Sequence, residues 1–179
     1  ASDVYKRQDL GGFAAATFKR GIAYINIPTT LLAMVDASVG GKTGINFNGL
    51  KNEIGAFAPA ASVLIETEFL RTLDAHNFFS VYAEMLKHGL ISNTSHWAEL
   101  LAFDTEKMDY GYLKKLVGHS VQVKEDIVEQ DPFEHGIRKA LNLGHTVGHA
   151  FESLALAENR PVLHGYAVAW GIVCELYLS

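Results

Sequence analysis

The sequence predicts the C-terminal part of an α/β domain followed by an all-α domain. Two observations carry this prediction. Apolar runs rich in β-prone residues, interrupted by Pro and Gly, occur only in the first third of the chain. From about Leu73 onward, apolar residues instead recur with a period near 3.6, which is typical of helices packed against a core. We therefore place the domain boundary near Leu73.

The first third contains four expected elements. Residues 9–19 have a helical pattern, and the run IAYINIP predicts a strand that Pro28 ends. The run TTLLAMVDASV predicts a short helix or turn that leads into a glycine-rich loop. The run SVLIET predicts a second, buried strand.

The remainder contains four helical patterns. The first three are HNFFSVYAEMLKHGLI, YLKKLVGHSVQVKEDIVEQD and LGHTVGHAFESLAL. The fourth, YAVAWGIVCELYL, is too short for a comfortable membrane span and contains Glu175, so we expect a buried helix.

Composition excludes several classes of protein. Hydrophobic residues make up 49% and charged residues 20%, as in ordinary globular proteins. The net charge of −5 lacks the basic excess of a nucleic-acid binder. The single cysteine excludes a disulfide framework, and no signal peptide is visible. These features favour a cytoplasmic protein with no nucleic-acid or membrane partner.

The N-terminal segment DVYKRQ has an unusual property. It can be back-translated as GAT GTG TAT AAG AGA CAG, which matches a transposon end used to make sequencing libraries. We expect residues 1–8 to be non-native and the chain to be a fragment of a longer protein, and we give those residues no functional weight.

The loop VDASVGGKTG nearly matches the phosphate-binding pattern G-x-x-x-x-G-K-[ST]. Asp36 stands at the leading glycine, where a carboxylate would face phosphate oxygens, so we reject a P-loop NTPase. Two interpretations of the loop remain equally open. It could bind an anion through its backbone amides and Lys42, or it could be a structural turn with a solvated lysine. The run GLKNEIGAF places Lys51 and Asn52 on what we expect to be a polar loop.

Two helical stretches carry metal-binding residue types. In YAEMLKHG, Glu84, Lys87 and His88 share one helical face. Glu84 and Lys87 could form an exposed ion pair, or Glu84 could be directed inward, where a buried carboxylate needs a cation or a metal as its partner. In RKALNLGHTVGHAFE, a polar strip would form if the helix continued through Gly144. Its members recur every three or four residues: Arg138, Asn142, His145, His149 and Glu152.

His164 precedes the last helical pattern. Histidines with a carboxylate suit a catalytic zinc site, although a solvated polar helix face would give the same spacing.

Together these motifs resemble the 3-dehydroquinate synthase family of the sugar-phosphate cyclase superfamily. The resemblance extends from about Asp9 to Ser179 and rests on RGIAYINIPTTLLAMVDASVGGKTGIN, GLKNEIGAF, YAEMLKHGLI, RKALNLGHTVGHAFE and LHGYAVAWG. It implies an NAD-binding α/β domain, represented here by residues 9–72, and a helical metal- and substrate-binding domain, residues 73–179, truncated at its C-terminus.

The resemblance also implies residue roles. The metal ligands, for zinc or cobalt, would be Glu84, His145 and His164. The NAD-contacting positions would be Asp9, Thr29, Thr30, Asp36, Lys42, Lys51, Phe69 and Thr72. The substrate-binding positions would be Arg20, Asn52, Lys124 and Arg138. The catalytic positions would be Lys42, Lys87, Asn142 and His149.

The implied reaction converts 3-deoxy-D-arabino-heptulosonate 7-phosphate into 3-dehydroquinate and phosphate, a lyase step of the shikimate pathway to aromatic amino acids. Within one cycle NAD would first be reduced, phosphate would then be eliminated, and NAD would be reoxidised. An intramolecular aldol closure would complete the ring. The family resemblance implies a homodimer for the full-length protein.

Three other functions remain open on sequence grounds. They are another sugar-phosphate cyclase, a metal-dependent alcohol or polyol dehydrogenase, and a metal-binding module without catalysis. The family's glycine-rich NAD loop should lie just before Asp9, where VYKRQ stands instead. We therefore expect the isolated fragment to be inactive.

Overall fold

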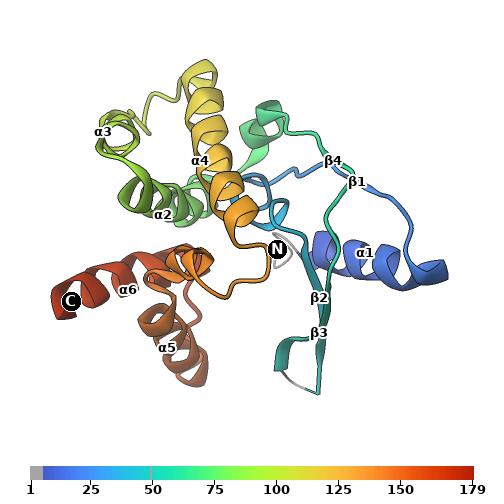
Figure 1. The fold of residues 1–179 in the computed structure, drawn as a ribbon. Helices are drawn as coiled ribbons and strands as arrows, with labels where there is room; N and C mark the ends of the chain where they lie inside the picture. The colour runs from blue at the N-terminus through green and yellow to red at the C-terminus, as the bar shows by residue number, and fades with distance from the viewer. Residues whose placement is uncertain (1–5, 49) are drawn as a thin grey trace. The chain divides into compact units, whose positions relative to one another are not determined.

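The computed structural model describes residues 6–48 and 50–179, and the chain divides into two compact units, residues 1–71 and residues 72–179 (Figure 1). Residues 1–5 of the segment expected to be non-native, and the side chain of Lys51, lie outside the described residues. Residues 6–8 form the first turn of helix α1.

The first unit mixes helices and strands. Its elements are α1 (Lys6–Thr17), η1 (Phe18–Arg20), β1 (Ile25–Asn26), the π-helical turn η2 (Ala33–Ala37), β2 (Lys42–Phe47), β3 (Leu50–Phe57), β4 (Ser62–Val63) and the 3₁₀ helix η3 (Thr67–Thr72), which ends at the unit boundary. Strands β2 and β3 form an antiparallel hairpin in which Lys42 lies opposite Phe57 and Gly44 opposite Gly55. Helix α1 packs on β2, with Gly12 against the side chain of Thr43.

Two expectations for the first unit are wrong. The run SVLIET is not a buried strand, because only Ser62 and Val63 pair, in parallel, with β1, and Leu64 is 55% exposed. Its apolar residues signal a capacity for burial, but the described residues of this unit provide no layer that covers them. In the stretch GLKNEIGAF, the described residues 50–57 are not a loop but strand β3, because their backbone pairs along most of β2.

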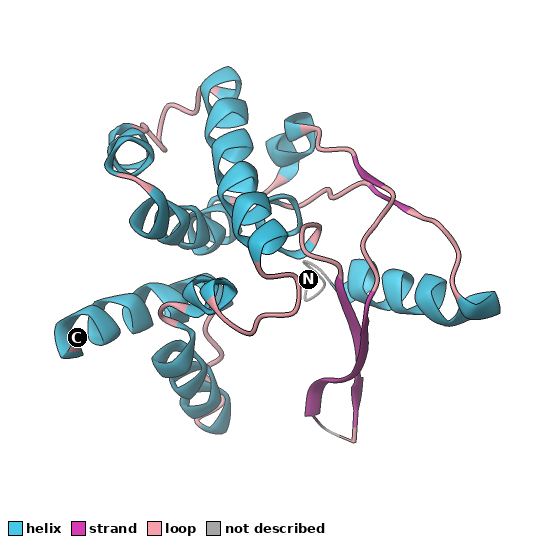
Figure 2. Ribbon diagram, viewed as in Figure 1, coloured by secondary structure: helices cyan, strands magenta, loops and turns pink. Residues whose placement is uncertain are grey.

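The second unit contains only helices among its described residues (Figure 2). They are α2 (Ala75–Ser92), α3 (Thr94–Ala102), α4 (Tyr110–Gln130), the 3₁₀ helix η4 (Ile137–Asn142), α5 (His145–Ala157) and α6 (His164–Leu178). Each of the first three α-helices is preceded by a residue whose side-chain oxygen accepts a hydrogen bond from a backbone N–H of the first turn. These caps are Asp74, Asn93 and Asp109.

Helix α2 is the centre of this unit. It packs against α3, α4 and α6, and α5 packs on α6. The apolar core includes Phe78 and Met85 of α2, Leu100 of α3 and Leu113 of α4, each at most 1% exposed. Burial of such side chains is the main source of stability for the unit. In the part of the chain that the structure describes, no helix has both the length and the apolar character needed to cross a membrane.

Helix α6 lies very close to its neighbours. A Cβ added to Gly165 would lie 1.5 Å from the carbonyl oxygen of Ser80 in α2, so only glycine permits this approach. The expectation that the last helix is buried holds for one face only. Val173 and Tyr177 are 70% and 89% exposed, because α5 and α2 cover the opposite face, which contains Ala167 and Val168.

Candidate metal and substrate site

The site begins with a buried ion pair on helix α2. Glu84 and Lys87 lie one turn apart, and their side chains are 1% and 2% exposed. Lys87 Nζ donates a hydrogen bond to Glu84 Oε2. A buried carboxylate requires such a partner, because removing its charge from water is costly. Glu84 is therefore directed inward, as one of the two sequence-based interpretations required.

Helix α5 does not continue through Gly144, so the predicted five-residue polar strip is wrong. Gly144 has φ = 80°, a left-handed conformation that glycine adopts readily, and it separates η4 from α5. Arg138 and Asn142 therefore belong to a different helix from His145. The break makes His145 the first residue of α5.

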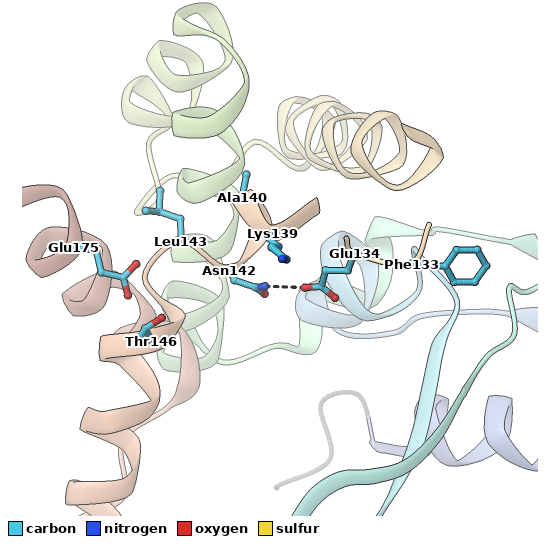
Figure 3. A pocket seen from close by; sticks show the side chains of 8 residues that line it. All are labelled: Phe133, Glu134, Lys139, Ala140, Asn142, Leu143, Thr146 and Glu175. Atoms are coloured by element: carbon cyan, nitrogen blue, oxygen red, sulfur yellow. Dashed lines mark hydrogen bonds between the residues drawn. The ribbon is translucent and has the colours of Figure 1, made fainter. Parts of the chain in front are cut away.

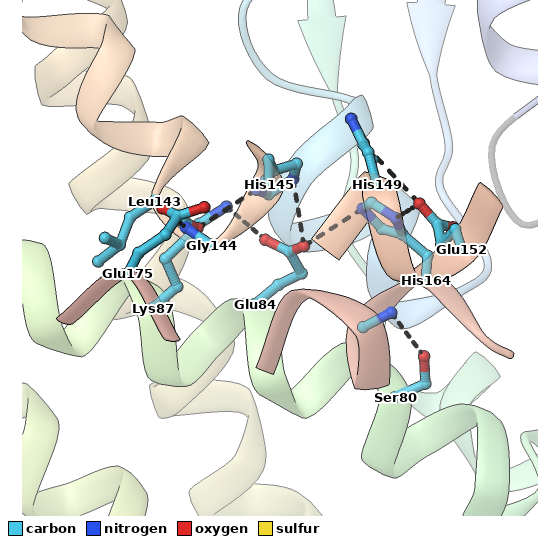
Figure 4. Close-up of polar contacts among 11 residues, drawn as sticks. Ser80, Glu84, Lys87, Leu143, Gly144, His145, His149, Glu152, His164 and Glu175 are labelled. Carbon is cyan, nitrogen blue, oxygen red and sulfur yellow. Dashed lines mark hydrogen bonds and ion pairs between the residues drawn. The ribbon is translucent and has the colours of Figure 1, made fainter. Parts of the chain in front are cut away.

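Two histidines from different helices approach the Glu84 carboxylate (Figure 4). His145 Nε2, from α5, lies 3.7 Å from Glu84 Oε1. His164 Nε2, from the first residue of α6, lies 3.5 Å from the same oxygen. The two imidazole rings are 5.2 Å apart between centroids. Three residues distant in sequence thus direct one atom each toward a common point.

The other ring nitrogen of each histidine faces an acceptor. His145 Nδ1 lies 3.3 Å from the carbonyl oxygen of Leu143. His164 Nδ1 lies 3.2 Å from Glu152 Oε2. A metal-ligating histidine usually donates its second N–H to a carbonyl or carboxylate, which fixes its tautomer and orientation. Both rings have the arrangement that leaves Nε2 available as a ligand.

These residues fit a divalent transition metal. One ligand atom from each of Glu84, His145 and His164 lies within 4.8 Å of the others. Ligand atoms around a tetrahedral ion with bonds of about 2.0–2.1 Å are about 3.4 Å apart, close to the two distances from Glu84 Oε1. Two imidazoles and one carboxylate form the three-ligand set of a catalytic zinc site, which leaves a further position open.

The pKa of His145 is lowered, mainly by burial and secondly by the positive charge of Lys87, although Glu84 acts in the opposite direction. The neutral imidazole is consequently favoured, and this is the form that binds a metal.

His149 lies close to the same cluster but is more exposed. Its ring centroid is 5.5 Å from that of His145, and its side chain is 61% exposed. Nε2 of His149 lies 3.8 Å from Glu152 Oε2. His149, Glu152 and His164 form a second group with metal-binding geometry, which shares His164 with the first. Of the two groups, the one with Glu84 has the more buried carboxylate.

Sequence reasoning missed two side chains that hold this site in place. Glu175 of α6 accepts hydrogen bonds from the backbone N–H groups of Gly144, at 2.6 Å, and Val147, at 3.1 Å. Ser80 Oγ of α2 accepts one from the N–H of Gly165, at 3.0 Å. A lone acid in the apolar run YAVAWGIVCELYL was a usable signal, since it needs a polar partner. Nothing in the sequence singles out Ser80.

Other residues expected in the second unit occupy two environments. Lys124 of α4 and Arg138 of η4 are buried, at 6% and 2% exposure, and their helices pack together. Arg138 Nη1 donates to the carbonyl oxygen of Pro132 at 2.5 Å. Asn142 is exposed and donates to Glu134 Oε1 at 2.7 Å, at the edge of an open pocket of about 600 Å³ that Glu175 also lines (Figure 3).

Within the first unit, the structure brings some expected residues together. Asp9 and Lys42 line one small cavity, and Asp9 and Asn52 line another pocket of about 250 Å³. The side chain of Thr30 accepts a hydrogen bond from the N–H of Ala33, at 3.3 Å, and Asp36 lies in η2.

The other expected positions of residues 9–72 lie outside these two cavities. Those whose side chains are described, Arg20, Thr29, Phe69 and Thr72, are exposed. Their roles stay predictions.

Comparison with known proteins identifies the family. A family model described as 3-dehydroquinate synthase N-terminal matches residues 6–80, and one described as 3-dehydroquinate synthase C-terminal matches residues 81–179. The chain is 67% identical over 171 residues to a 3-dehydroquinate synthase of Parabacteroides distasonis, covering 96% of this chain and 48% of the relative. It is 47% identical over 171 residues to one of Streptococcus pyogenes, covering 96% and 47%.

Solved structures show the broader class, the sugar-phosphate cyclase fold. A 2-epi-5-epi-valiolone synthase from Streptomyces hygroscopicus subsp. jinggangensis, with NAD⁺ and Zn²⁺ bound, matches with a TM-score of 0.81 and 33% identity, covering 92% of this chain and 46% of that one. A 2-deoxy-scyllo-inosose synthase complexed with carbaglucose-6-phosphate, NAD⁺ and Co²⁺ matches with a TM-score of 0.81 and 28% identity, covering 93% and 46%.

The chain belongs to the 3-dehydroquinate synthase family. It spans about half the length of the curated relatives that it matches.

Proposed function

We propose that this chain is part of an enzyme that converts 3-deoxy-D-arabino-heptulosonate 7-phosphate into 3-dehydroquinate and phosphate. The observation that carries the proposal is the convergence of Glu84, His145 and His164, from three helices, beside the buried cation Lys87. Family membership supplies the reaction to which this arrangement would be applied.

In this proposal Glu84, His145 and His164 hold the metal, and NAD is the redox cofactor. A bound zinc or cobalt ion would act as a Lewis acid that lowers the pKa of a coordinated substrate hydroxyl, while NAD would accept and return a hydride. Related cyclases of known structure have NAD⁺ with Zn²⁺ or with Co²⁺ bound.

The remaining residues of the helical unit would bind and orient the substrate. Lys124 and Arg138 are buried cations on packed helices, and we assign them to the substrate carboxylate. Exposed His149 and Asn142 would contact the reacting sugar phosphate. Lys87 would hold the Glu84 carboxylate in its ionised form and contribute positive charge beside the substrate.

The first unit would supply contacts to the cofactor and phosphate. The proposal assigns NAD contacts to Asp9, Thr29, Thr30, Asp36, Lys42, Lys51, Phe69 and Thr72, and phosphate contacts to Arg20 and Asn52. Shared cavities, which join Asp9 to Lys42 and to Asn52, support part of this assignment. The whole enzyme would act as a cytoplasmic homodimer.

A closely related cyclase that acts on another heptulose phosphate is the second candidate, because both solved relatives are cyclases of this broader class. The buried pair Lys124 and Arg138 favours a substrate that carries a carboxylate.

Phosphate release tests the proposed reaction. The chain, joined to the remaining half of its parent sequence, should release phosphate from 3-deoxy-D-arabino-heptulosonate 7-phosphate, and a chelator should abolish that release. The isolated chain should release none. Phosphate release only from a heptulose phosphate without the carboxylate would contradict the substrate assignment and favour the second candidate.

The separate roles of His145 and His149 can be tested by zinc content. His145→Ala should lose the zinc bound with Glu84, because one of three protein ligands is removed. His149→Ala should retain that zinc yet lower the rate of phosphate release by the full-length enzyme. Equal loss of zinc in both variants would mean that the two histidines bind the metal together.

A further inference from the structure

A third group of potential metal ligands lies in the helical unit, apart from the two groups that share His164. His96 and Glu99 come from α3 and share one face at i and i+3, and His119 comes from α4, which packs on α3. One ligand atom from each lies within 4.8 Å of the others. His119 Nδ1 is 3.2 Å from Glu99 Oε2, and the rings of His96 and His119 are 5.5 Å apart between centroids.

An ion pair between Glu99 and His119 explains only part of this geometry. His96 is 4% exposed, and its Nε2 lies 3.1 Å from Ser120 Oγ. Its Nδ1 is buried and has no hydrogen-bond partner within the described ranges 6–48 and 50–179. Buried polar atoms in folded proteins are nearly always satisfied, so this nitrogen calls for a ligand.

The surroundings also suit a metal. The three side chains line a pocket of about 270 Å³ that Asp126 also lines, as a further carboxylate. The pKa of His96 is lowered, mainly by burial and secondly by the charge of His119. The neutral form of His96, which binds metals, is therefore favoured. The contact with Ser120 provides the outer hydrogen bond that orients a ligating histidine.

We propose that His96, Glu99 and His119 form a second divalent-metal site, separate from the one at Glu84, that binds zinc and links α3 to α4. Two imidazoles and a carboxylate select zinc and similar ions over Mg²⁺ and Ca²⁺, which prefer ligand sets made of oxygen atoms. Because none of the three residues belongs to the proposed active site, the second site does not depend on the proposed function.

Zinc stoichiometry of the purified chain tests this site. The chain is loaded with zinc chloride, passed over a desalting column, and its zinc content is measured by mass spectrometry. Glu99→Gln and His119→Gln should each lose one equivalent of zinc per chain while keeping the equivalent bound with Glu84. Both changes are at partly exposed side chains, so the fold should persist, as circular dichroism can verify. His135→Gln is the matched control, because His135 is exposed and belongs to none of the three groups.

A second variant measures the orienting contact. Ser120→Ala removes the partner of His96 Nε2 and should weaken zinc binding at this site by about 10–100-fold, as measured by calorimetry in a His145→Ala background. Undiminished zinc content in both Glu99→Gln and His119→Gln would overturn the proposal. The result is independent of the ligand assignment at Glu84, which the zinc content of His145→Ala and His149→Ala tests separately.

Discussion

Glu175 gives the most direct test of how the site is held together. Its carboxylate, on α6, accepts the N–H groups of Gly144 and Val147 at the start of α5, the helix that begins with His145. These are the backbone donors that a helix N-terminus leaves unsatisfied. A negative charge there also interacts favourably with the helix dipole. Replacing Glu175 with Gln keeps the size of the side chain but removes the charge.

The magnitude follows from the two hydrogen bonds. A bond to a charged acceptor contributes about 1.5–3 kcal/mol and a neutral one about 0.5–1.5 kcal/mol. Glu175→Gln can keep one neutral bond through its single oxygen, and its NH₂ group would face the second N–H. Taking the lower end for a partly buried group, we expect the free energy of unfolding to fall by about 2 kcal/mol. For a chain of this length, the melting temperature should fall by about 4–8 °C.

Urea denaturation followed by circular dichroism measures the free energy, and calorimetry with zinc chloride measures the metal affinity. Because Glu175 positions the start of α5, zinc affinity should fall by about 10–100-fold. Glu158→Gln is the control, since Glu158 forms an exposed ion pair with Arg160 and should change stability by less than about 1 kcal/mol. If Glu175→Gln is no less stable than Glu158→Gln, the capping argument is wrong.

Two further predictions concern other parts of the helical unit. Gly165→Ala places a Cβ 1.5 Å from the Ser80 carbonyl oxygen, so urea denaturation should show a loss of about 4 kcal/mol or more, together with lost zinc because His164 is displaced. Gly118→Ala is the control, because the new Cβ on α4 has nothing within 4 Å. It should stabilise the chain by about 0.4–1 kcal/mol. Equal stability of Gly165→Ala and Gly118→Ala would refute the packing argument. Burial raises the pKa of Asp131, but hydrogen bonds from the N–H groups of Gly136, His135 and Arg138 lower it more, and the resulting pKa is below its usual value. The stabilisation from these bonds is therefore present above about pH 3.9 and is lost as the pH falls through the folded-state pKa, so the deficit of Asp131→Asn in urea denaturation should shrink at low pH. A deficit that does not change with pH would contradict this assignment.

The sequence by itself predicted most of the long helices, though not α3, and the family. Helical periodicity identified the regions of α2, α4, α5 and α6, because apolar residues recur in them about every 3.6 residues. The family resemblance also pointed to Glu84, His145 and His164, although the histidine spacing alone favoured a solvated helix face. The strands were less predictable. The polar residues of β3 were taken for a loop, although the strand pairs with the neighbouring β2, and β4 was taken for a buried strand, although it pairs only briefly with the distant β1.

Only the tertiary structure decided how these residues meet. The left-handed Gly144 precedes α5 and separates it from η4, so that Arg138 and Asn142 lie on a different helix from the histidines of α5. The close approach at Gly165 brings His164 to Glu84, and Glu175 fastens the start of α5 from 31 residues away in sequence. The same holds for His96 and His119, which meet because α3 packs on α4. Spacing along one helix fixes which side chains share a face, but a ligand set drawn from three helices exists only once those helices pack.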